Sequence, residues 1–246
     1  MDRRELLRGM LAGVAVGPAV EAGAGGQEPA DPSVYIPKAH LVQDRQFLHA
    51  FMDEYSFVDL VTTSPTLRIT HIPSVLDRSK GAFGTIFGHI SAQNAQVAAI
   101  RGGERAVVAF RGPQGYVSPG WLVTPASTSG VPTWNFAVVH ASGRLKPIDE
   151  PMQKHALLST LIGKYEKAIG GTSYDFAKLP IDDVLARAKG IQPFELEITQ
   201  LEGKFKLFQE RAEPDREAML AHFRSGGYTE RSLLAFTEHF YTSAPK

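Results

Sequence analysis

The sequence predicts a mainly β protein, an antiparallel barrel with helices added around it. Several short segments alternate apolar and polar residues, as strands with one buried face do. Helical segments fall between some of them, without the regular strand–helix alternation of a doubly wound parallel sheet. Gly143 lies inside one long strand segment, where a glycine favours a bulge or a sharp bend. Because such bends let a sheet curl on itself, we expect a barrel.

The composition is that of an ordinary soluble globular protein. The chain has 246 residues, of which 43% are hydrophobic and 21% charged, enough for one large domain with a real core. Lysine plus arginine total 26, as do aspartate plus glutamate, so DNA binding is not indicated by charge and would need a local basic patch. Cysteine is absent, which excludes disulfides, thiolate metal sites and cysteine nucleophiles.

Residues 1–26 have the layout of an export signal. Arg3-Arg4 precede a short apolar run, Met10–Val20, and Ala22-Gly23-Ala24 resembles a small-residue cleavage site. The paired arginines make the segment similar to a twin-arginine signal, and the apolar run is too short for a membrane span. We therefore expect a periplasmic or otherwise exported protein; the alternative is an ordinary N-terminal helix on a cytoplasmic protein. Residues 25–33 are expected to form a linker.

The first half of the chain supplies four of the expected strands. Asp44 is expected to cap a helix that runs to about Tyr55, because apolar residues recur there at helical spacing. A second helix is expected from its cap, Ser91, to Ile100, and Ser64-Pro65 is expected to form a turn. The strands are expected over Phe57–Thr63, Leu67–Pro73, Gly84–Ile90 and Arg105–Arg111.

The second half supplies the remaining strands and most of the helices. One strand is expected from Trp134 to Arg144. Phe194–Thr199 shows the strictest alternation, and we expect Glu202-Gly203 to interrupt this strand before the alternation resumes over Lys204–Gln209. Helices are expected over 149–168, 181–188, 215–224 and 230–240, with a loop at 170–180.

Two histidine-bearing strand ends form the first candidate site. Thr70 and His71 stand in one strand and His89 in the next, and a helix starting at Ser91 would bring Asn94 beside them. Free backbone N–H groups at a helix N-terminus attract anions such as phosphate. The alternative is that Ser91 only caps the helix and that the histidines are satisfied structural groups.

Two Gly/Pro-rich bends carry the second candidate site. It consists of Ser118, Trp121, Trp134 and Asn135. An aromatic face next to hydroxyl and amide groups suits a flat heteroaromatic ligand, which needs stacking and a few hydrogen bonds. The alternative is that both tryptophans are core residues whose indole N–H groups have found partners.

Two lysines form the third candidate site. Lys204 and Lys206, near Gln209, are expected on one face of a strand, where they could hold a phosphate or a carboxylate. The alternative is a solvated strand face. The sequence does not indicate other common chemistries. Ser118 lies outside any G-x-S-x-G motif, which argues against a serine hydrolase. The sequence also lacks the H-E-x-x-H zinc motif, the Walker phosphate-binding motif and the dinucleotide-binding motif.

Six motifs between residues 34 and 211 occur in an order typical of one protein family. They are Val34-Tyr35-Ile36-Pro37, Thr70-His71-Ile72-Pro73, Gly88-His89-Ile90 with Asn94, Phe110 to Trp121, Val131 to His140 and Leu201 to Gln209. Two of them, V-P-T-W-N and G-K-F-K-L, are unusual and therefore specific. In these residues the chain resembles the PaiB-like family, the FMN-binding negative transcriptional regulators.

The resemblance implies an FMN-binding split β-barrel over residues 34–211, usually a homodimer with its flavin in the groove between the subunits. Residues 212–246 would then be a C-terminal helical extension. Together with the two lysines of the last motif, the residues expected to bind the cofactor are Thr70, His71, His89, Ser91, Asn94, Ser118, Trp121, Trp134, Asn135, Lys204 and Lys206.

The sequence departs from the family's pattern in three places. Gln209-Glu210-Arg211 carries a carboxylate where the family usually has an asparagine, which weakens the case for an anion at that corner. Gly120 stands where a serine is common, and Leu122 where an aromatic residue often follows. The twin-arginine-like leader is foreign to a cytoplasmic repressor.

These observations predict an exported FMN-binding protein that acts as a flavin-dependent oxidoreductase or a cofactor carrier. One alternative is a cytoplasmic FMN-binding transcriptional regulator that contacts DNA. Another is haem binding in the same barrel, with His89 or His239 as the axial ligand.

Overall fold

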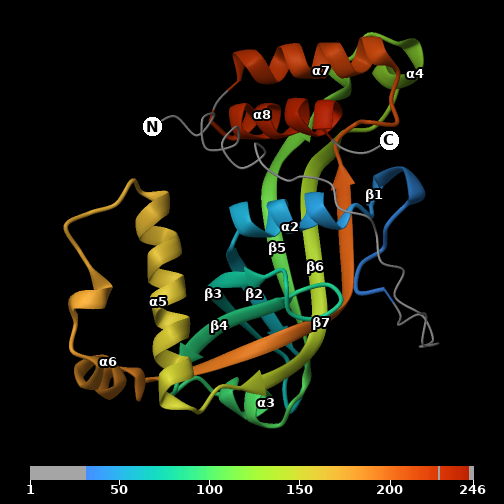
Figure 1. Cartoon of the computed structure of the whole chain (residues 1–246). Coiled ribbons are helices and arrows are strands. Elements are labelled where there is room, and N and C mark those ends of the chain that lie inside the picture. Colours follow the sequence, from blue (N-terminus) through green and yellow to red (C-terminus); the bar gives the residue numbers. More distant parts are fainter. Residues whose placement is uncertain (1–31, 227, 244–246) are drawn as a thin grey trace, which may run out of the picture.

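The computed structural model describes residues 32–226 and 228–243, so the predicted leader at residues 1–26 lies outside the described residues. The strands are β1 (Leu41–Val42), β2 (Phe57–Thr62), β3 (Arg68–Asp77), β4 (Thr85–Ser91), β5 (Arg105–Val117), β6 (Thr133–Pro147) and β7 (Ile191–Lys206). They form one antiparallel sheet in the order β1-β7-β4-β3-β2-β5-β6, and a further pairing of β6 with β7 closes six of them into a barrel (Figure 1). The expected antiparallel barrel is confirmed.

Most strands lie where the alternation of the sequence places them, but β5 is longer than expected. It does not end at Arg111 and continues to Val117, past a shift in its register with β6 between Arg111 and Gln114. Pro113 lies inside this shift, and because a proline cannot donate a ladder hydrogen bond, the irregularity accommodates it without ending the strand.

Two glycines of the barrel mark places where no side chain fits. At Gly143 the register of β6 against β7 shifts, as expected, and a Cβ there would lie 2.1 Å from the Glu197 carbonyl oxygen. The interruption predicted at Glu202-Gly203 is wrong, because β7 runs unbroken through both residues. A Cβ on Gly203 would lie 2.4 Å from Leu48 Cδ2, so this glycine admits a helix against the strand.

The long helices confirm their predictions. Asp44 caps the first one, accepting a hydrogen bond of 2.6 Å from the backbone N–H of Phe47. These helices are α2 (Arg45–Glu54), α5 (Pro151–Ala168), α6 (Ile181–Ala188), α7 (Glu213–Ser225) and α8 (Tyr228–Ser243). Short turns that the sequence did not indicate are η1 (Lys38–His40), η2 (Pro119–Trp121), α4 (Pro125–Thr128) and η3 (Phe176–Lys178).

The helix predicted over Ser91–Ile100 is wrong. Ser91 is the last residue of β4 and pairs with Ile191 of β7, so sheet pairing fixes its backbone and it caps no helix. Residues 92–96 form turns, and α3 (Val97–Arg101) follows as a helix of only five residues.

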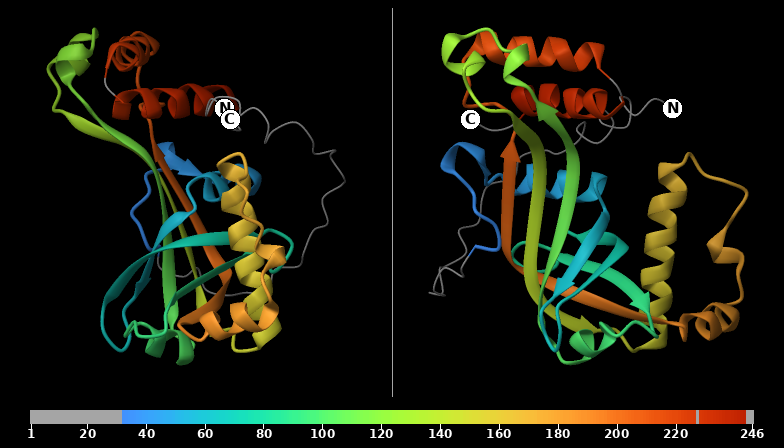
Figure 2. Two further views of the ribbon diagram at one scale, coloured as in Figure 1. Left: turned by 90° about the vertical axis from the view of Figure 1, so that its left-hand side faces the viewer. Right: turned by 180° about the vertical axis from the view of Figure 1, so that it is seen from behind.

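Helices cover both ends and one side of the barrel. At one end α2 packs Phe51 against Phe205, with 5.0 Å between the ring centroids, and at the other end α3 buries Ile100. The buried Leu157 and Leu161 of α5 pack against the outer side of β3 and β4, while α7 and α8 lie across the far end of the β5–β6 hairpin (Figure 2). None of the helices in the described part of the chain is long and apolar enough to cross a membrane.

Candidate functional site

One row of paired residues crosses the outer face of the barrel. The strand register places His71 opposite Asp59, Asp59 opposite Ala109, Ala109 opposite His140, and His140 opposite Glu202. Because directly paired residues point to the same face of a sheet, these side chains from five strands share one surface. Ala109 has the smallest side chain of the row, and polar residues lie on both sides of it.

The first polar end, which we call the first rim, consists of His71, Asp59 and Arg111. His71 donates through Nδ1 to Asp59 Oδ1 at 2.5 Å, and Arg111 Nε lies 3.0 Å from Asp59 Oδ2. The carboxylate is mostly shielded, whereas the imidazole and the guanidinium are exposed. Asp59 therefore holds one edge of each group and leaves the other edge facing solvent.

The second rim lies two strands away and consists of His140, Glu202 and Lys204. Ser33 connects the first two of these residues. Its Oγ accepts from His140 Nδ1 at 2.9 Å and donates to Glu202 Oε2 at 2.5 Å, and its backbone N–H also donates to this carboxylate. Burial lowers the pKa of His140, although the nearby Glu202 charge opposes the shift, so the imidazole is neutral near pH 7.

Lys204 and Lys206 share one face of β7, as expected. Lys206 donates to Thr133 Oγ1, which fixes its ammonium group. Lys204 lies over the rings of Tyr35 and Phe136, with its Nζ 5.5 Å from each centroid. No carboxylate of the described residues forms an ion pair with Lys204, so this cation is available to a ligand.

Between the rims the surface is flat and aliphatic. This apolar floor consists of Val61, Val107, Ala109 and Val138, which occupy neighbouring outward positions of β2, β5 and β6. Two strand spacings of about 4.8 Å separate β2 from β6, so the floor is roughly 10 Å wide. Its dimensions and its polar edges suit a planar heteroaromatic ring with hydrogen-bonding groups at its periphery.

Two large apolar side chains on the same face are exposed. Phe57 is 68% exposed and Ile69 is 56% exposed, although both belong to central strands of the barrel. Ile69 is paired with Val61 and so widens the floor, whereas Phe57 lies beyond the Asp59–His71 pair. Exposed apolar side chains on both sides of a polar pair favour an interaction surface on this face.

Thr70 and Asn94 do not join this surface. Thr70 Oγ1 accepts from Asn94 Nδ2 at 3.0 Å and donates to Gln96 Oε1 at 2.5 Å. The fully buried Gln96 donates in turn to the Leu60 carbonyl and to Thr62 Oγ1. This is a satisfied polar network near α3. It binds the chain to itself, and no helix N-terminus is available there for an anion.

His89 lies on the outer side of β4 and is not part of the row that carries His71. It lines a cavity of about 290 Å³ beneath α5, together with Pro73 of β3. Ser74 pairs with Gly88, which places Pro73 opposite His89. Its Nδ1 is buried and has no hydrogen-bond partner. Burial lowers the pKa of this imidazole, so it is neutral near pH 7.

The two tryptophans meet through a third aromatic ring. Tyr116 stands edge-on to Trp121 at 6.0 Å and to Trp134 at 6.2 Å. Trp121 also stacks on His222 of α7, whereas Trp134 is 54% exposed. The indoles therefore do not form a slot with each other within one chain, and Trp134 alone offers an open face.

The polar neighbours of the tryptophans serve local structure. Ser118 Oγ accepts from the Gly120 N–H at 3.2 Å and begins the η2 turn. Asn135 is fully buried, with its Nδ2 3.2 Å from the sulfur of Met219, and its Oδ1 has no partner.

Sequence reasoning missed Asp59 and Arg111, which complete the first rim. A signal for Asp59 was present, because a hairpin centred on the Ser64-Pro65 turn pairs this acid in an apolar strand with His71. It also missed Asp215, which accepts from the backbone N–H groups of Val123 and Thr124 at 2.9 Å each. No local pattern indicates this contact, since it joins α7 to a distant loop.

Comparison with known proteins agrees with the motifs of the sequence. Residues 34–200 match a family described as "Putative FMN-binding domain". "Protease synthase and sporulation protein PAI 2" of Bacillus subtilis is 30% identical over 183 residues, which are 74% of this chain and 85% of that protein. Two solved structures align with TM-scores of 0.48, the FAD and haem binding protein from Mycobacterium smegmatis and the flavocytochrome Anf3 from Azotobacter vinelandii. The Mycobacterium smegmatis protein is 16% identical, and the alignment covers 77% of this chain and 81% of that protein. The Azotobacter vinelandii protein is 13% identical, and the alignment covers 71% of this chain and 70% of that protein. The family match spans well over half of the sequence, and the chain therefore belongs to this family of FMN-binding domains, the PaiB-like proteins that its motifs resemble.

Proposed function

We propose that FMN binds over the apolar floor on the outer face of the barrel, in a groove that a second copy of the chain completes. The single observation that carries this proposal is the position of the floor between two polar rims. The floor offers a flat contact for the ring system, and the rims offer donors and cations on both sides.

The groups on the rims fit the chemistry of FMN. Its phosphate needs positive charge, and Lys204 supplies an ammonium group that no carboxylate of the described residues pairs with. Arg111 keeps an exposed guanidinium edge beyond its contact with Asp59. His71 and His140 stand where they can bond to the polar edge of a ring. The flavin would supply the electron transfer, while these residues hold and orient it.

A second copy is the partner that the open face favours. Ile69 leaves exposed apolar surface beside the floor, and Phe57 does so on the other side of the Asp59–His71 pair. A two-fold interface buries the same patch on both chains. The exposed Trp134, at the far end of the long β5–β6 hairpin, would be available to contact the partner.

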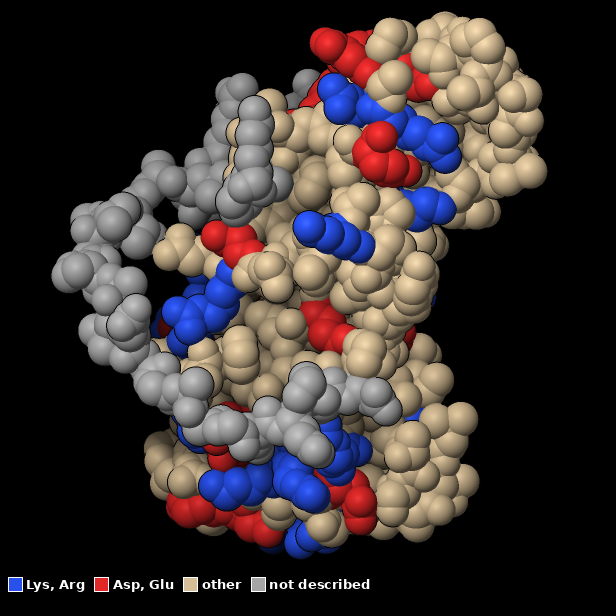
Figure 3. All heavy atoms as spheres, turned by 90° about the vertical axis from the view of Figure 1, so that its right-hand side faces the viewer, with Lys and Arg blue, Asp and Glu red and all other residues tan. Residues whose placement is uncertain are grey.

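We further propose that the protein is an exported flavin-dependent oxidoreductase or cofactor carrier. The twin-arginine-like residues near the start of the sequence support the export. A DNA-binding regulator has less support, because lysines and arginines lie beside aspartates and glutamates on the face in Figure 3, and the net charge is zero.

Flavin titration of the full chain tests the proposal. Purified protein reconstituted with FMN should retain the flavin absorption bands after gel filtration and sediment as a dimer. Phe57→Glu should shift sedimentation toward the monomer and weaken FMN binding, whereas Ile181→Glu, at an exposed apolar position on α6, should do neither. Repeated reconstitution without bound flavin would remove the proposal.

A further inference from the structure

The cavity beneath α5 is a separate feature from the groove. Its volume is about 290 Å³, and it shares no residue with the floor or with either rim. Its walls are mostly apolar, with Leu158 and Ile162 from α5 and Pro73 from β3, and the rings of Tyr165 and Tyr174 complete them. A concave apolar site of this size accommodates a small molecule with one aromatic ring.

One polar group of the cavity lacks a partner within the chain. His89 Nδ1 is buried and makes no hydrogen bond, which is uncommon for a buried polar atom and calls for an explanation. A neutral imidazole carries one donor and one acceptor nitrogen, so His89 can bond to a ligand without adding charge to the site.

The charge of the cavity is negative. Glu166 lines it, and Thr172 Oγ1 donates to Glu166 Oε2 at 2.7 Å. The backbone N–H of Tyr174 donates to the same Thr172 hydroxyl at 3.0 Å, so Thr172 links the carboxylate to the backbone of Tyr174. A site with one carboxylate and a neutral imidazole favours a cation or a neutral molecule over an anion.

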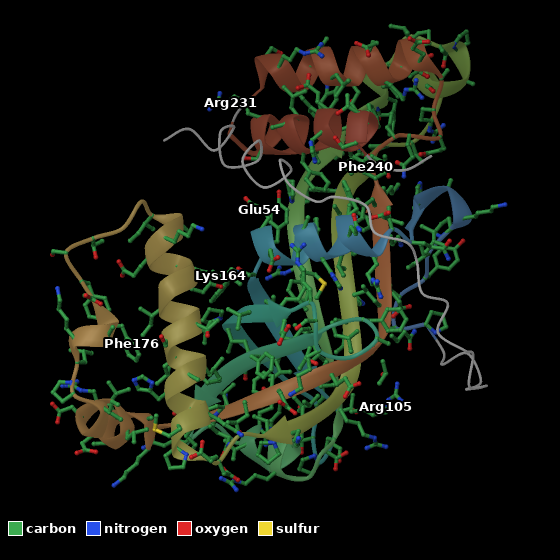
Figure 4. The ribbon with its side chains drawn as sticks, viewed as in Figure 1. Glu54, Arg105, Lys164, Phe176, Arg231 and Phe240 are labelled. Atoms are coloured by element: carbon green, nitrogen blue, oxygen red, sulfur yellow. The ribbon has the colours of Figure 1, made fainter. Side chains whose placement is uncertain are left out.

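Lys164 of α5 lies near the cavity but pairs with acids outside it. Its Nζ is 5.6 Å from the ring centroid of Tyr165 and 3.8 Å from Asp53 Oδ1 of α2, and its side chain extends toward α2 in Figure 4, where Glu54 is also labelled. No lysine or arginine is among the residues that line the cavity. A phosphate group, and with it the phosphate of FMN, therefore finds no cation among the lining residues.

We propose that this cavity is a second ligand site, which binds a small aromatic amine. The ring packs between the aliphatic and tyrosine side chains, the amino group pairs with Glu166, and His89 provides the hydrogen bond that fixes the orientation. The inference goes beyond the proposed flavin site and does not depend on it.

Two probes of similar size and opposite charge test the charge preference. We expect 2-phenylethylamine to bind the full-length protein, measured by calorimetry and by ligand-detected NMR, and phenylacetate to bind about tenfold more weakly or worse. Glu166→Gln should weaken the amine about two- to fivefold, the range of a partly exposed ion pair, and reduce the difference between the probes.

A pair of tryptophan substitutions on one helix tests the location. Ile162→Trp fills the cavity and should weaken amine binding about tenfold or more. Ser159→Trp places the same side chain at an exposed position of α5 and should leave binding unchanged. If Ile162→Trp does not fold, as judged by its melting temperature, Leu158→Phe replaces it.

Three outcomes would overturn the proposal: neither probe binds the wild type, phenylacetate binds as tightly as the amine, or the cavity-filling variant binds the amine normally. FMN content measured on the same samples separates the two proposals. A variant that loses amine binding but retains FMN tests the cavity proposal alone. A variant that loses FMN but still binds the amine tests the groove proposal alone.

Discussion

The imidazole of His222 lies parallel to the indole of Trp121, with 3.7 Å between the ring centroids and 15° between the ring planes. His222 belongs to α7 and Trp121 to the turn after β5, so the stack joins the C-terminal helices to the end of the β5–β6 hairpin. Tyr116 stands edge-on to the same indole, with 6.0 Å between the ring centroids. We call this assembly of the hairpin end, α7 and α8 the arm.

Removing the stack should loosen the arm. His222→Ala is expected to lower the free energy of unfolding by about 1 kcal/mol, since an aromatic pair contributes about that much beyond its buried area. His222→Phe preserves a flat ring and should recover most of the loss. Urea unfolding followed by far-UV circular dichroism measures both, and equal stabilities for the alanine variant and the wild type would contradict the prediction.

Asp215 should make stability depend on pH in the acid range. Burial opposes its ionisation, but hydrogen bonds from Ser127, Thr124 and the Val123 N–H outweigh burial and hold its pKa well below the usual 3.8. Its contribution to the free energy of unfolding is therefore complete above about pH 3.8 and is lost as the pH falls below this value. Asp215→Asn should cost about 1 to 3 kcal/mol at neutral pH, because hydrogen bonds to a charged acceptor are lost, and should reduce the dependence of stability on pH in the acid range. Unfolding curves between neutral and acid pH test this, and an unchanged acid limb would count against it.

Two glycine-to-alanine changes should act in opposite directions. Gly203→Ala drives a methyl group to within 2.4 Å of Leu48 and should destabilise the barrel by about 1 to 3 kcal/mol. Gly163→Ala lies in α5, where a new Cβ meets nothing within 4 Å, and should stabilise the protein by about 0.5 to 1 kcal/mol. Thermal melts of the two variants compare them directly. A tolerated Gly203→Ala would mean that α2 does not pack on β7 as described.

The half-buried His89 should lower stability as the pH falls. Burial places its folded-state pKa below the ordinary value of 6.5, so below about that pH the unfolded chain binds a proton that the folded chain does not. The loss is at most about 1.4 kcal/mol per pH unit between the two pKa values. His89→Phe removes this titration and should give a shallower slope, measured by chemical unfolding at a series of pH values. An identical slope would show that His89 titrates normally in the fold.

The first rim should contribute to flavin affinity. Arg111→Ala is expected to weaken FMN binding about tenfold, because a charge-assisted hydrogen bond is lost. Arg105→Ala is the matched control. It removes an exposed arginine of the same strand, near the opposite end of the barrel from the arm (Figure 4). Titration by absorption distinguishes them, and equal losses in both variants would indicate a non-specific charge effect.

Much of the fold could be read from local patterns. Alternation located the strands because each has one face toward the core, and the Asp44 cap marked the start of α2. The errors arose where a local signal had a tertiary cause. Gly203 resembles a strand breaker, yet it is small because Leu48 approaches it. Ser91 resembles a helix cap, yet sheet pairing with Ile191 claims it.

The candidate site was less predictable, because it depends on register across five strands. The sequence indicated His71 and Lys204 separately, but their shared surface follows from a series of strand pairings that together bring these two residues, more than one hundred positions apart, onto one face. Asn135 shows the same limit from the other direction. Its position beside Trp134 suggested an amide that hydrogen-bonds to a ligand, but Asn135 is fully buried, with its Nδ2 next to the sulfur of Met219 in α7. Long-range packing of this kind leaves no signal in the local sequence.

The position of the two tryptophans has a consequence for optical experiments. Both indoles of the protein belong to the arm, and both touch Tyr116. Intrinsic tryptophan fluorescence therefore reports on the docking of α7 against the hairpin end, and the barrel core, which contains phenylalanine and aliphatic side chains, emits almost nothing on excitation of indole. Comparing emission with backbone dichroism in one denaturation series would reveal whether the arm detaches before the barrel opens.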